Sequence, residues 1–235
     1  MAMQTVLLDS FTTASSIQLR NHISDNGVSW SSPLQGTNAL DTARVGGGSV
    51  YSQGGLPTND CFANHANPLA NRAFEILATV RVEPEHNYDL ATVNIRPHTL
   101  GGLNQTNAAG ISLSALGTNV IPANRTIRAI CGETGGAYNL PAPGPQDVEV
   151  LIRCMQGGSG AQGWKLQYYV NNVLAYEELD PPVVNVATND IAHQYAGLSV
   201  QGISSVLSME VLVDDGEVIA PGAFWNSLVR ATEIP

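Results

Sequence analysis

Hydrophobic and polar residues alternate along much of the chain. In residues 74–82, the even-numbered side chains from Phe74 to Val82 are apolar, whereas Glu75, Thr79 and Arg81 point to the opposite side. A period of two places successive side chains on opposite faces of a β-strand. We therefore predict a strand with one buried and one solvent-facing side. The same pattern predicts strands over 89–96, 147–154 and 207–214.

Residues 164–178 have the pattern of a β-hairpin. Asn171-Asn172 separates two strand-like runs, and asparagine tolerates the positive φ angles of a type I′ turn. Such a turn pairs Val170 with Val173, so the even-numbered residues of 164–170 share one face, which we predict to be buried. Tyr169 and Tyr176 are then expected close together on the opposite face.

Further strands are expected near 5–11, 49–52, 110–116, 126–131 and 195–201, giving about eleven or twelve strands. No window shows a long amphipathic helical repeat, so a parallel β/α architecture is disfavoured. We predict an all-β fold, an antiparallel two-sheet jelly-roll sandwich formed as a single domain by residues 1–216. The proline-rich segment 139–145 is interpreted as a stiff connector between strands.

Residues 217–235 are predicted to form a C-terminal tail. Four apolar residues in it have the spacing of one side of a short helix, which a lone sandwich would bury poorly. We expect a contact with a partner subunit, and the alternative is a terminus packed on its own domain. The four residues are Phe224, Trp225, Leu228 and Val229.

Composition and charge exclude several classes of function. The 235 residues include 10 basic and 20 acidic side chains, and the resulting charge of −10 disfavours nucleic-acid binding through phosphates. No apolar stretch is long enough to cross a membrane. The 3 cysteines have no regular spacing and are expected to be reduced and mostly buried. The first residues do not resemble a signal peptide, which predicts a protein that stays in the cytoplasm where it is made until assembly or release.

The sequence offers no recognisable catalytic set. Glu210 and Asp214 are expected on one outward face, but a solvated acidic strand end explains them without catalysis. Asp214, Asp215 and Glu217 form a weak calcium candidate, since Asp and Gly also favour turns. The 5 histidines lack the spacing of a zinc site. We predict no enzyme activity, no metal and no cofactor.

Exposed tyrosines are the candidate binding residues. Tyr169 and Tyr176, together with Tyr51 or Tyr138, could stack on sugar rings, because aromatic side chains combine an apolar face with a polar tip. Cross-strand pairing that only stabilises the sheet is the alternative.

Several blocks resemble the concanavalin A-like, or laminin G-like, sandwich domains. They are residues 7–11 (LLDSF), 26–30 (NGVSW), 50–52 (VYS), the hairpin 164–175, 195–198 (YAGL) and the terminal strand 209–215. The opening block is also similar to those of bacteriophage virion proteins. The resemblance implies a lectin-like or glucanase-like sandwich, with glycan binding as a frequent activity. Retaining β-glucanases of this fold carry Glu-x-Asp-x-x-Glu, which is absent here.

Three functions therefore compete. The leading hypothesis is a non-enzymatic phage structural protein, a capsid decoration or tail component located in the virion, which assembles with other virion proteins and with copies of itself. The second is a carbohydrate-binding module that recognises host surface glycans. The third is a glycoside hydrolase with an unrecognised acid pair.

Overall fold

The computed structural model describes residues 3–31, 43–53, 61–64, 73–82, 92–98, 110–116, 126–132, 136–141, 144–156, 164–179, 184–185, 190–191 and 195–214. These residues form antiparallel β-sheets, and the one helical element among them is a short 3₁₀ turn, Leu19–Asn21. None of the described residues form a helix long enough to cross a membrane.

Two large sheets contain almost all of the strands. The nine-stranded sheet has the order β14-β13-β12-β7-β18-β5-β4-β2, with β1 also paired to β18. Its strands are β1 (Met3–Asp9), β2 (Ile17–Gln18), β4 (Ala43–Val45), β5 (Val50–Ser52), β7 (Phe74–Val82), β12 (Gln146–Gln156), β13 (Trp164–Val170), β14 (Val173–Leu179) and β18 (Ser205–Asp214).

The seven-stranded sheet has the order β11-β10-β9-β8-β17-β6-β3. Its strands are β3 (Ser29–Ser31), β6 (Cys61–Asn64), β8 (Thr92–His98), β9 (Ile111–Leu116), β10 (Thr126–Cys131), β11 (Gly136–Pro141) and β17 (Tyr195–Gln201). Two short strands, β15 (Val184–Asn185) and β16 (Asp190–Ile191), pair only with each other.

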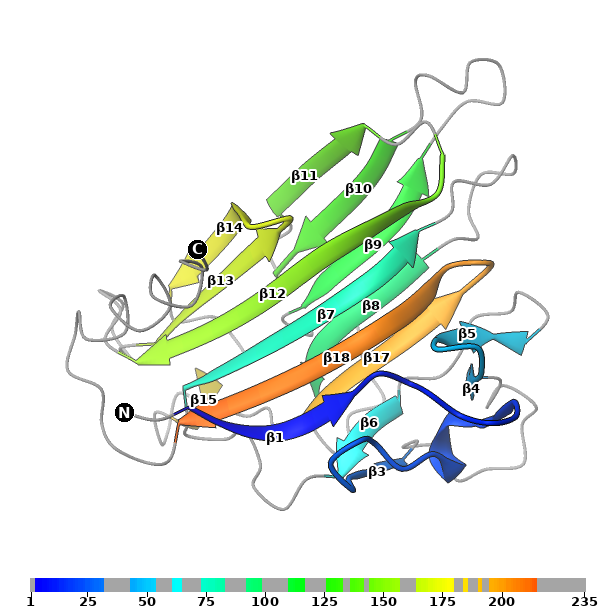
Figure 1. Cartoon of the computed structure of the whole chain (residues 1–235). Coiled ribbons are helices and arrows are strands. Elements are labelled where there is room, and N and C mark those ends of the chain that lie inside the picture. The colour runs from blue at the N-terminus through cyan, green and yellow to red at the C-terminus, as the bar shows by residue number, and fades with distance from the viewer. Residues whose placement is uncertain are drawn as a thin grey trace, which may run out of the picture.

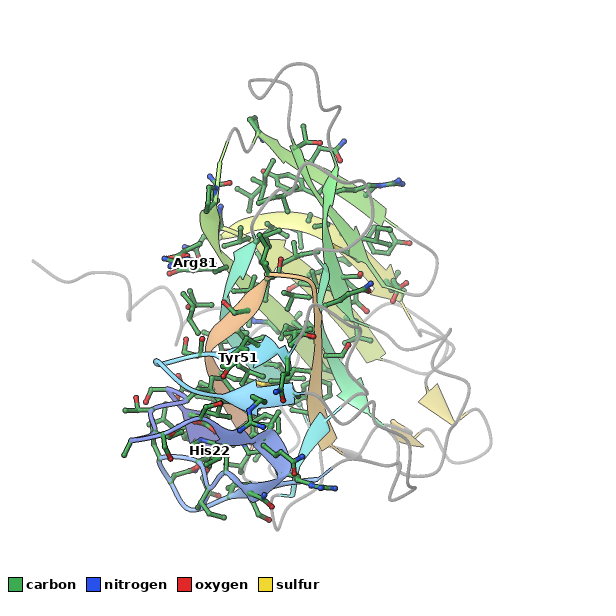
Figure 2. All side chains as sticks on the ribbon, turned by 90° about the vertical axis from the view of Figure 1, so that its right-hand side faces the viewer. His22, Tyr51 and Arg81 are labelled. Atoms are coloured by element: carbon green, nitrogen blue, oxygen red, sulfur yellow. The ribbon has the colours of Figure 1, made fainter. Side chains whose placement is uncertain are left out.

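The two large sheets stack face to face, as Figure 1 shows with the nine-stranded sheet in front. Figure 2 views the layers from the side, with side chains filling the space between them. The alternating apolar residues of both sheets make one core, which confirms the predicted two-sheet sandwich. Its fully buried members include Phe74, Ile76 and Ile152 from one sheet and Ile95, Leu113 and Ile127 from the other.

The predicted strands are largely confirmed. Residues 74–82, 126–131 and 195–201 are strands with the expected bounds, and the other predicted strands are found with ends shifted by a few residues. The connector assigned to 139–145 was wrong in its first part, because β11 continues to Pro141. Proline is tolerated there because β11 is the edge of its sheet, where an unpaired position needs no N–H donor.

The predicted hairpin turn is also confirmed. Asn171 and Asn172 adopt φ angles of 48° and 62°, and Val170 pairs with Val173. The Asn171 side chain accepts a hydrogen bond from the Glu149 backbone N–H at 2.9 Å, which ties the turn to β12. The turn therefore fixes the register of three neighbouring strands.

A buried carboxylate organises the N-terminal segment. Asp9 is fully buried and accepts hydrogen bonds from the Phe11 N–H at 2.8 Å and from Trp30 Nε1 at 2.8 Å. A third hydrogen bond joins Asp9 to His22 Nε2 at 2.9 Å. His22, labelled in Figure 2, is itself buried. The Phe11 ring also contacts the rings of His22 and Trp30.

The two sheets approach closely where β14 lies beside β10 and β11. Gly136 faces the ring of Tyr176, and an added Cβ would overlap that ring. Gly132 has a φ of 72° and faces the carboxylate of Glu178, which also accepts a hydrogen bond from Tyr168 at 3.0 Å. Glycine is required at both positions because a side chain would push the sheets apart.

The cysteines fit the expectation where they are described. Cys131 and Cys154 are free and buried, whereas the side chain of Cys61 lies outside the described residues. Burial, with a smaller effect of the Glu178 carboxylate, raises the pKa of Cys131 to about 12. Burial also raises the pKa of Cys154 well above its ordinary value. Both thiols therefore stay protonated and unreactive.

We expect Asp9→Ala to lower the free energy of unfolding by about 3–5 kcal/mol, because it leaves several buried donors without an acceptor. Urea denaturation followed by Trp fluorescence measures the loss. The matched control is Asp25→Ala, which removes an exposed carboxylate bonded to the Ser10 N–H and should cost about 1 kcal/mol or less. Equal effects of the two replacements would show that the Asp9 cluster does not organise this segment.

Candidate functional site

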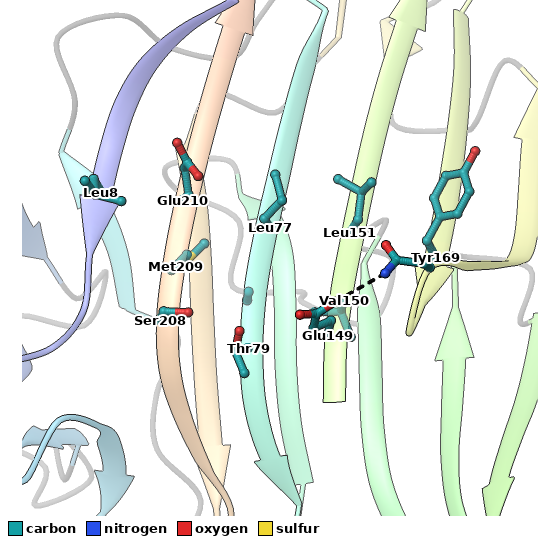
Figure 3. A pocket seen from close by; sticks show the side chains of 12 residues that line it. Leu8, Leu77, Thr79, Glu149, Val150, Leu151, Tyr169, Ser208, Met209 and Glu210 are labelled. Atoms are coloured by element: carbon teal, nitrogen blue, oxygen red, sulfur yellow. Dashed lines mark hydrogen bonds between the residues drawn. The ribbon is translucent and has the colours of Figure 1, made fainter. Parts of the chain in front are cut away.

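A cavity of about 260 Å³ lies on the outer face of the nine-stranded sheet (Figure 3). Five adjacent strands, β1, β18, β7, β12 and β13, and the turn after β13 contribute to its walls. The lining residues are Leu8, Leu77, Ala78, Thr79, Glu149, Val150, Leu151, Tyr169, Asn172, Ser208, Met209 and Glu210.

Strand register places one row of side chains directly across the cavity. Leu8 pairs with Glu210, Glu210 with Leu77, Leu77 with Leu151, and Leu151 with Tyr169. Since residues opposite one another in an antiparallel sheet lie on the same face, these five side chains form a continuous band. Figure 3 shows four of them, from Glu210 to Tyr169, side by side.

The band consists mainly of apolar side chains in outward positions. Leu77 and Leu151 occupy positions where alternation calls for solvent-facing residues, and both are half-buried. Leu8 is 45% exposed although it lies in a regular strand. An apolar residue on the polar face of a strand is the sequence signal that points to this surface. The prediction of the binding residues considered aromatic side chains alone and therefore missed all three leucines.

Polar groups flank the apolar band. Glu210 accepts a hydrogen bond from the Thr5 hydroxyl at 3.1 Å. On β12, Glu149 accepts a hydrogen bond from the Asn172 side-chain amide at 3.4 Å, drawn as a dashed line in Figure 3. Thr79 pairs with both Glu149 and Ser208, so the hydroxyls of Thr79 and Ser208 continue the row that begins at Glu149. The cavity therefore offers apolar surface together with several hydrogen-bond acceptors and donors.

Tyr169 is held in place at one wall of the cavity. The Arg153 guanidinium lies over its ring, 5.4 Å from the centroid, and its hydroxyl donates a hydrogen bond to Gln167 at 3.0 Å. Gln167 in turn donates to Glu177 at 2.7 Å, and Lys165 forms an ion pair with the same carboxylate at 2.7 Å. Partial burial raises the pKa of Glu177, but the hydrogen bonds from Lys165 and Gln167 outweigh it and hold this pKa below its usual range.

Arg153 is itself anchored by a buried ion pair. Its Nε atom lies 2.7 Å from Glu75 Oε1, and the side chains are only 9% and 5% exposed. A second pair, Arg81 with Asp147, joins the same two strands at the same distance of 2.7 Å but is 47% and 46% exposed. Both ion pairs join an arginine to a carboxylate across the same two strands, and they differ in burial. We therefore expect loss of a carboxylate to destabilise the fold more in the buried pair than in the exposed one.

The tyrosines singled out in the sequence do not gather at one place. Tyr169 lines the cavity, but Tyr176 lies on the opposite face of the sheet. The prediction that these two side chains lie close together on one face was therefore wrong. A β-bulge in β14 lets Tyr176 pair with Tyr168 instead, and their rings stack with centroids 6.2 Å apart. The extra residue, Ala175, moves Tyr176 to the opposite side of the strand, where it packs on the core.

The other two tyrosines lie elsewhere. Tyr51, on β5, bonds to the Ser16 hydroxyl at 2.7 Å and does not line the cavity (Figure 2). Tyr138, on β11 of the other sheet, is partly buried against the core.

The acidic candidates are separated in the structure. Glu210 lines the cavity, whereas Asp214 is buried at the end of β18 and is not part of the lining. Asp215 and Glu217 of the calcium candidate, and Phe224, Trp225, Leu228 and Val229 of the tail, lie outside the described residues. Within the described part of the chain, no three His, Cys, Asp or Glu side chains group closely enough to hold a metal ion.

Comparison with solved structures identifies the fold. An endo-acting O-glycanase from the human gut microbiota, described as initiating mucin breakdown, matches with a TM-score of 0.54 and 10% identity over 90% of this chain and 100% of its own. An endo-1,3-β-glucanase from Streptomyces sioyaensis matches with a TM-score of 0.51 and 10% identity over 90% and 96% of the two chains.

These likenesses show the concanavalin A-like lectin and glucanase sandwich that the sequence resemblance implied. At this level of identity they show the fold alone. No family model matches the chain, and no curated protein matches it in sequence.

We expect Glu75→Ala to lower the free energy of unfolding by about 3–5 kcal/mol, because it removes the carboxylate from a buried guanidinium. Asp147→Ala, which breaks the exposed pair between the same strands, should cost about 1 kcal/mol or less. Chemical denaturation of the two variants measures both values. A Glu75→Ala variant as stable as Asp147→Ala would show that burial does not distinguish the two pairs.

Proposed function

We propose that the protein binds carbohydrate in the cavity on the outer face of its nine-stranded sheet. The observation that carries this proposal is the composition of the cavity wall, where an apolar band ending in Tyr169 runs between side chains able to form hydrogen bonds. Small-molecule sites are typically concave, mostly apolar and provided with a few placed polar groups.

Sugar rings match such a wall because they have apolar C–H faces and hydroxyl groups around their edges. The C–H face packs on Tyr169 and on the adjacent Leu151 and Leu77, while the hydroxyls reach the carboxylates and the Asn172 amide. Arg153 covers one side of the Tyr169 ring, so a sugar stacks on the side that faces the cavity. The volume of about 260 Å³ suits a short saccharide segment.

The comparisons support this proposal at a coarse level. The two structures with the higher TM-scores are described as an O-glycanase and a β-glucanase, both of which act on glycans. The shared fold makes a glycan a reasonable ligand class for this chain. It does not distinguish binding from cleavage.

We expect Tyr169→Ala to weaken glycan binding about tenfold, because hot-spot aromatic side chains contribute more than about 1 kcal/mol each. A glycan array selects the ligand, and isothermal titration then measures the dissociation constant. Tyr51→Ala is the matched control, since Tyr51 also belongs to the nine-stranded sheet but does not line the cavity. Absence of binding to every glycan, or equal losses in the two variants, would contradict the proposal.

Hydrolysis is the second candidate function, and one observation favours it: Glu149 and Glu210 line the same cavity. Two carboxylates on opposite sides of a glycosidic bond are what inverting and retaining hydrolases require. A reducing-end assay on the glycan that the array selects decides between the candidates. Binding without release of reducing ends supports a binding protein, whereas release that stops in both Glu149→Gln and Glu210→Gln makes the protein a hydrolase.

We further propose that the protein works as a structural component of a phage particle. The support is the resemblance of residues 7–11 to the opening blocks of virion proteins, together with the absence of the glucanase motif from the sequence. A glycan-binding capsid decoration or tail component would use the cavity to hold the particle at a host surface. Repeated copies on a symmetric particle would increase the strength of attachment.

If this location is correct, phage particles purified on a density gradient from the producing culture should contain this chain at a copy number similar to that of other structural proteins. Quantitative mass spectrometry of the gradient fractions measures that number. Recovery of the chain only from soluble fractions that lack particles would contradict the virion location and would leave carbohydrate binding untouched.

A further inference from the structure

The cavity carries a negative charge that is not balanced by any basic residue in its lining. Of its 12 described lining residues, Glu149 and Glu210 are acidic and none is Lys, Arg or His. The two carboxylates come from β12 and β18, which flank β7, so they lie on opposite sides of its outward residues Leu77 and Thr79 (Figure 3). A ligand in the cavity therefore meets an acidic group on either side.

Three basic residues on the same face are already engaged with other acids. Arg153 pairs with Glu75, Arg81 with Asp147, and Lys165 with Glu177, all across neighbouring strands of the nine-stranded sheet. Each of these ion pairs has an N···O distance of 2.7 Å. A fourth basic residue, Arg44 on β4, lies outside the cavity lining and hydrogen-bonds to Ser16 and Gln53.

Within the described residues, the side chains of Glu149 and Glu210 accept hydrogen bonds from the neutral side chains of Asn172 and Thr5. In this part of the chain, neither carboxylate of the cavity is therefore paired with a basic residue.

From this distribution of charge, we propose that the cavity selects glycans bearing a protonated amino group, of the glucosamine type, and rejects glycans built from uronates. An ammonium group can approach either carboxylate and form a charge-assisted hydrogen bond. A uronate would bring its own carboxylate toward Glu149 or Glu210, where like charges repel. An N-acetylated sugar has no charge and gains only the packing and neutral hydrogen bonds.

This inference rests on the proposed carbohydrate binding and names its ligand class. The size of the effect follows from the exposure of the site. A partly exposed ion pair improves binding up to about fivefold, so two such pairs give a preference of about tenfold over the acetylated sugar at low salt. About 1 M salt shortens the screening length to about 3 Å and should remove most of the preference.

The test compares three tetrasaccharides by isothermal titration at about pH 6, where primary amines are protonated. They are a glucosamine tetramer, its fully N-acetylated counterpart and a uronate tetramer. We expect the glucosamine tetramer to bind about tenfold more tightly than the acetylated one, and the uronate tetramer to show no binding. The preference should fall below about twofold in the Glu149→Gln/Glu210→Gln variant and in wild-type protein at high salt.

A control separates the cavity from the general negative charge of the chain. Asp25→Asn/Asp147→Asn removes the same number of acidic groups from positions outside the cavity and should keep the preference. If this control loses the preference as fully as the cavity variant, the attraction is nonspecific and the inference is wrong. Should the double variant of the cavity fail to fold, the single variants Glu149→Gln and Glu210→Gln provide the same decision, because each should lose part of the preference while the control keeps it.

The outcomes also separate this inference from the proposed function. If none of the three tetrasaccharides binds and a glycan array is blank, carbohydrate binding itself is overturned. If the acetylated tetramer binds as tightly as the glucosamine tetramer, or the uronate tetramer binds, carbohydrate binding stands and selection by charge is overturned.

Discussion

The register of five antiparallel strands is the constraint on which the rest of the structure depends. Because β1, β18, β7, β12 and β13 pair without a shift along the row from Leu8 to Tyr169, one outward side chain from each strand joins a common band. A slip of one residue in any of these pairs would exchange outward and inward side chains. The core and the cavity are therefore specified by the same backbone hydrogen bonds, because each strand directs alternate side chains to the core and to the outer face.

Two devices hold this register. The Asn171-Asn172 turn fixes β13 against β14, and its first asparagine also reaches the backbone of Glu149 on β12. The buried Glu75–Arg153 pair then joins β12 to β7. Arg153 has a second role because its guanidinium rests on the Tyr169 ring. The groups that stabilise the sheet thus also determine how Tyr169 is presented to a ligand.

Much of the fold could be predicted from the sequence, because residues 74–82, 126–131 and 195–201 alternate cleanly and need no tertiary information. The short strands β2, β4 and β6 could not be predicted, since a few residues do not establish a period. The burial of His22 could not be predicted from the sequence either, because it depends on a hydrogen bond to Asp9, which is not a sequence neighbour.

The candidate site was predicted only in part. Tyr169 was one of four candidate binding residues, and the structure places it at the cavity. Tyr176 was predicted on the wrong face of the sheet. The bulge at Ala175 exchanges the inward and outward side chains of the residues that follow it in β14. The leucines of the band had a visible signal, since Leu77 and Leu151 interrupt an otherwise polar face. That signal gains meaning only when the register shows that they are neighbours.

The bulge in β14 and the glycine at position 136 depend on one another. The extra residue turns Tyr176 inward, and the absence of a side chain at Gly136 leaves room for its ring between the edges of the two sheets. Neither feature is useful alone, because an inward ring without the glycine would clash and the glycine without the ring would leave a gap. Among evolutionary relatives, the length of this strand and the residue at this position should therefore covary. Without the bulge, Tyr176 would pair with Gln167 and present its ring on the outer face, the side on which Tyr169 lies.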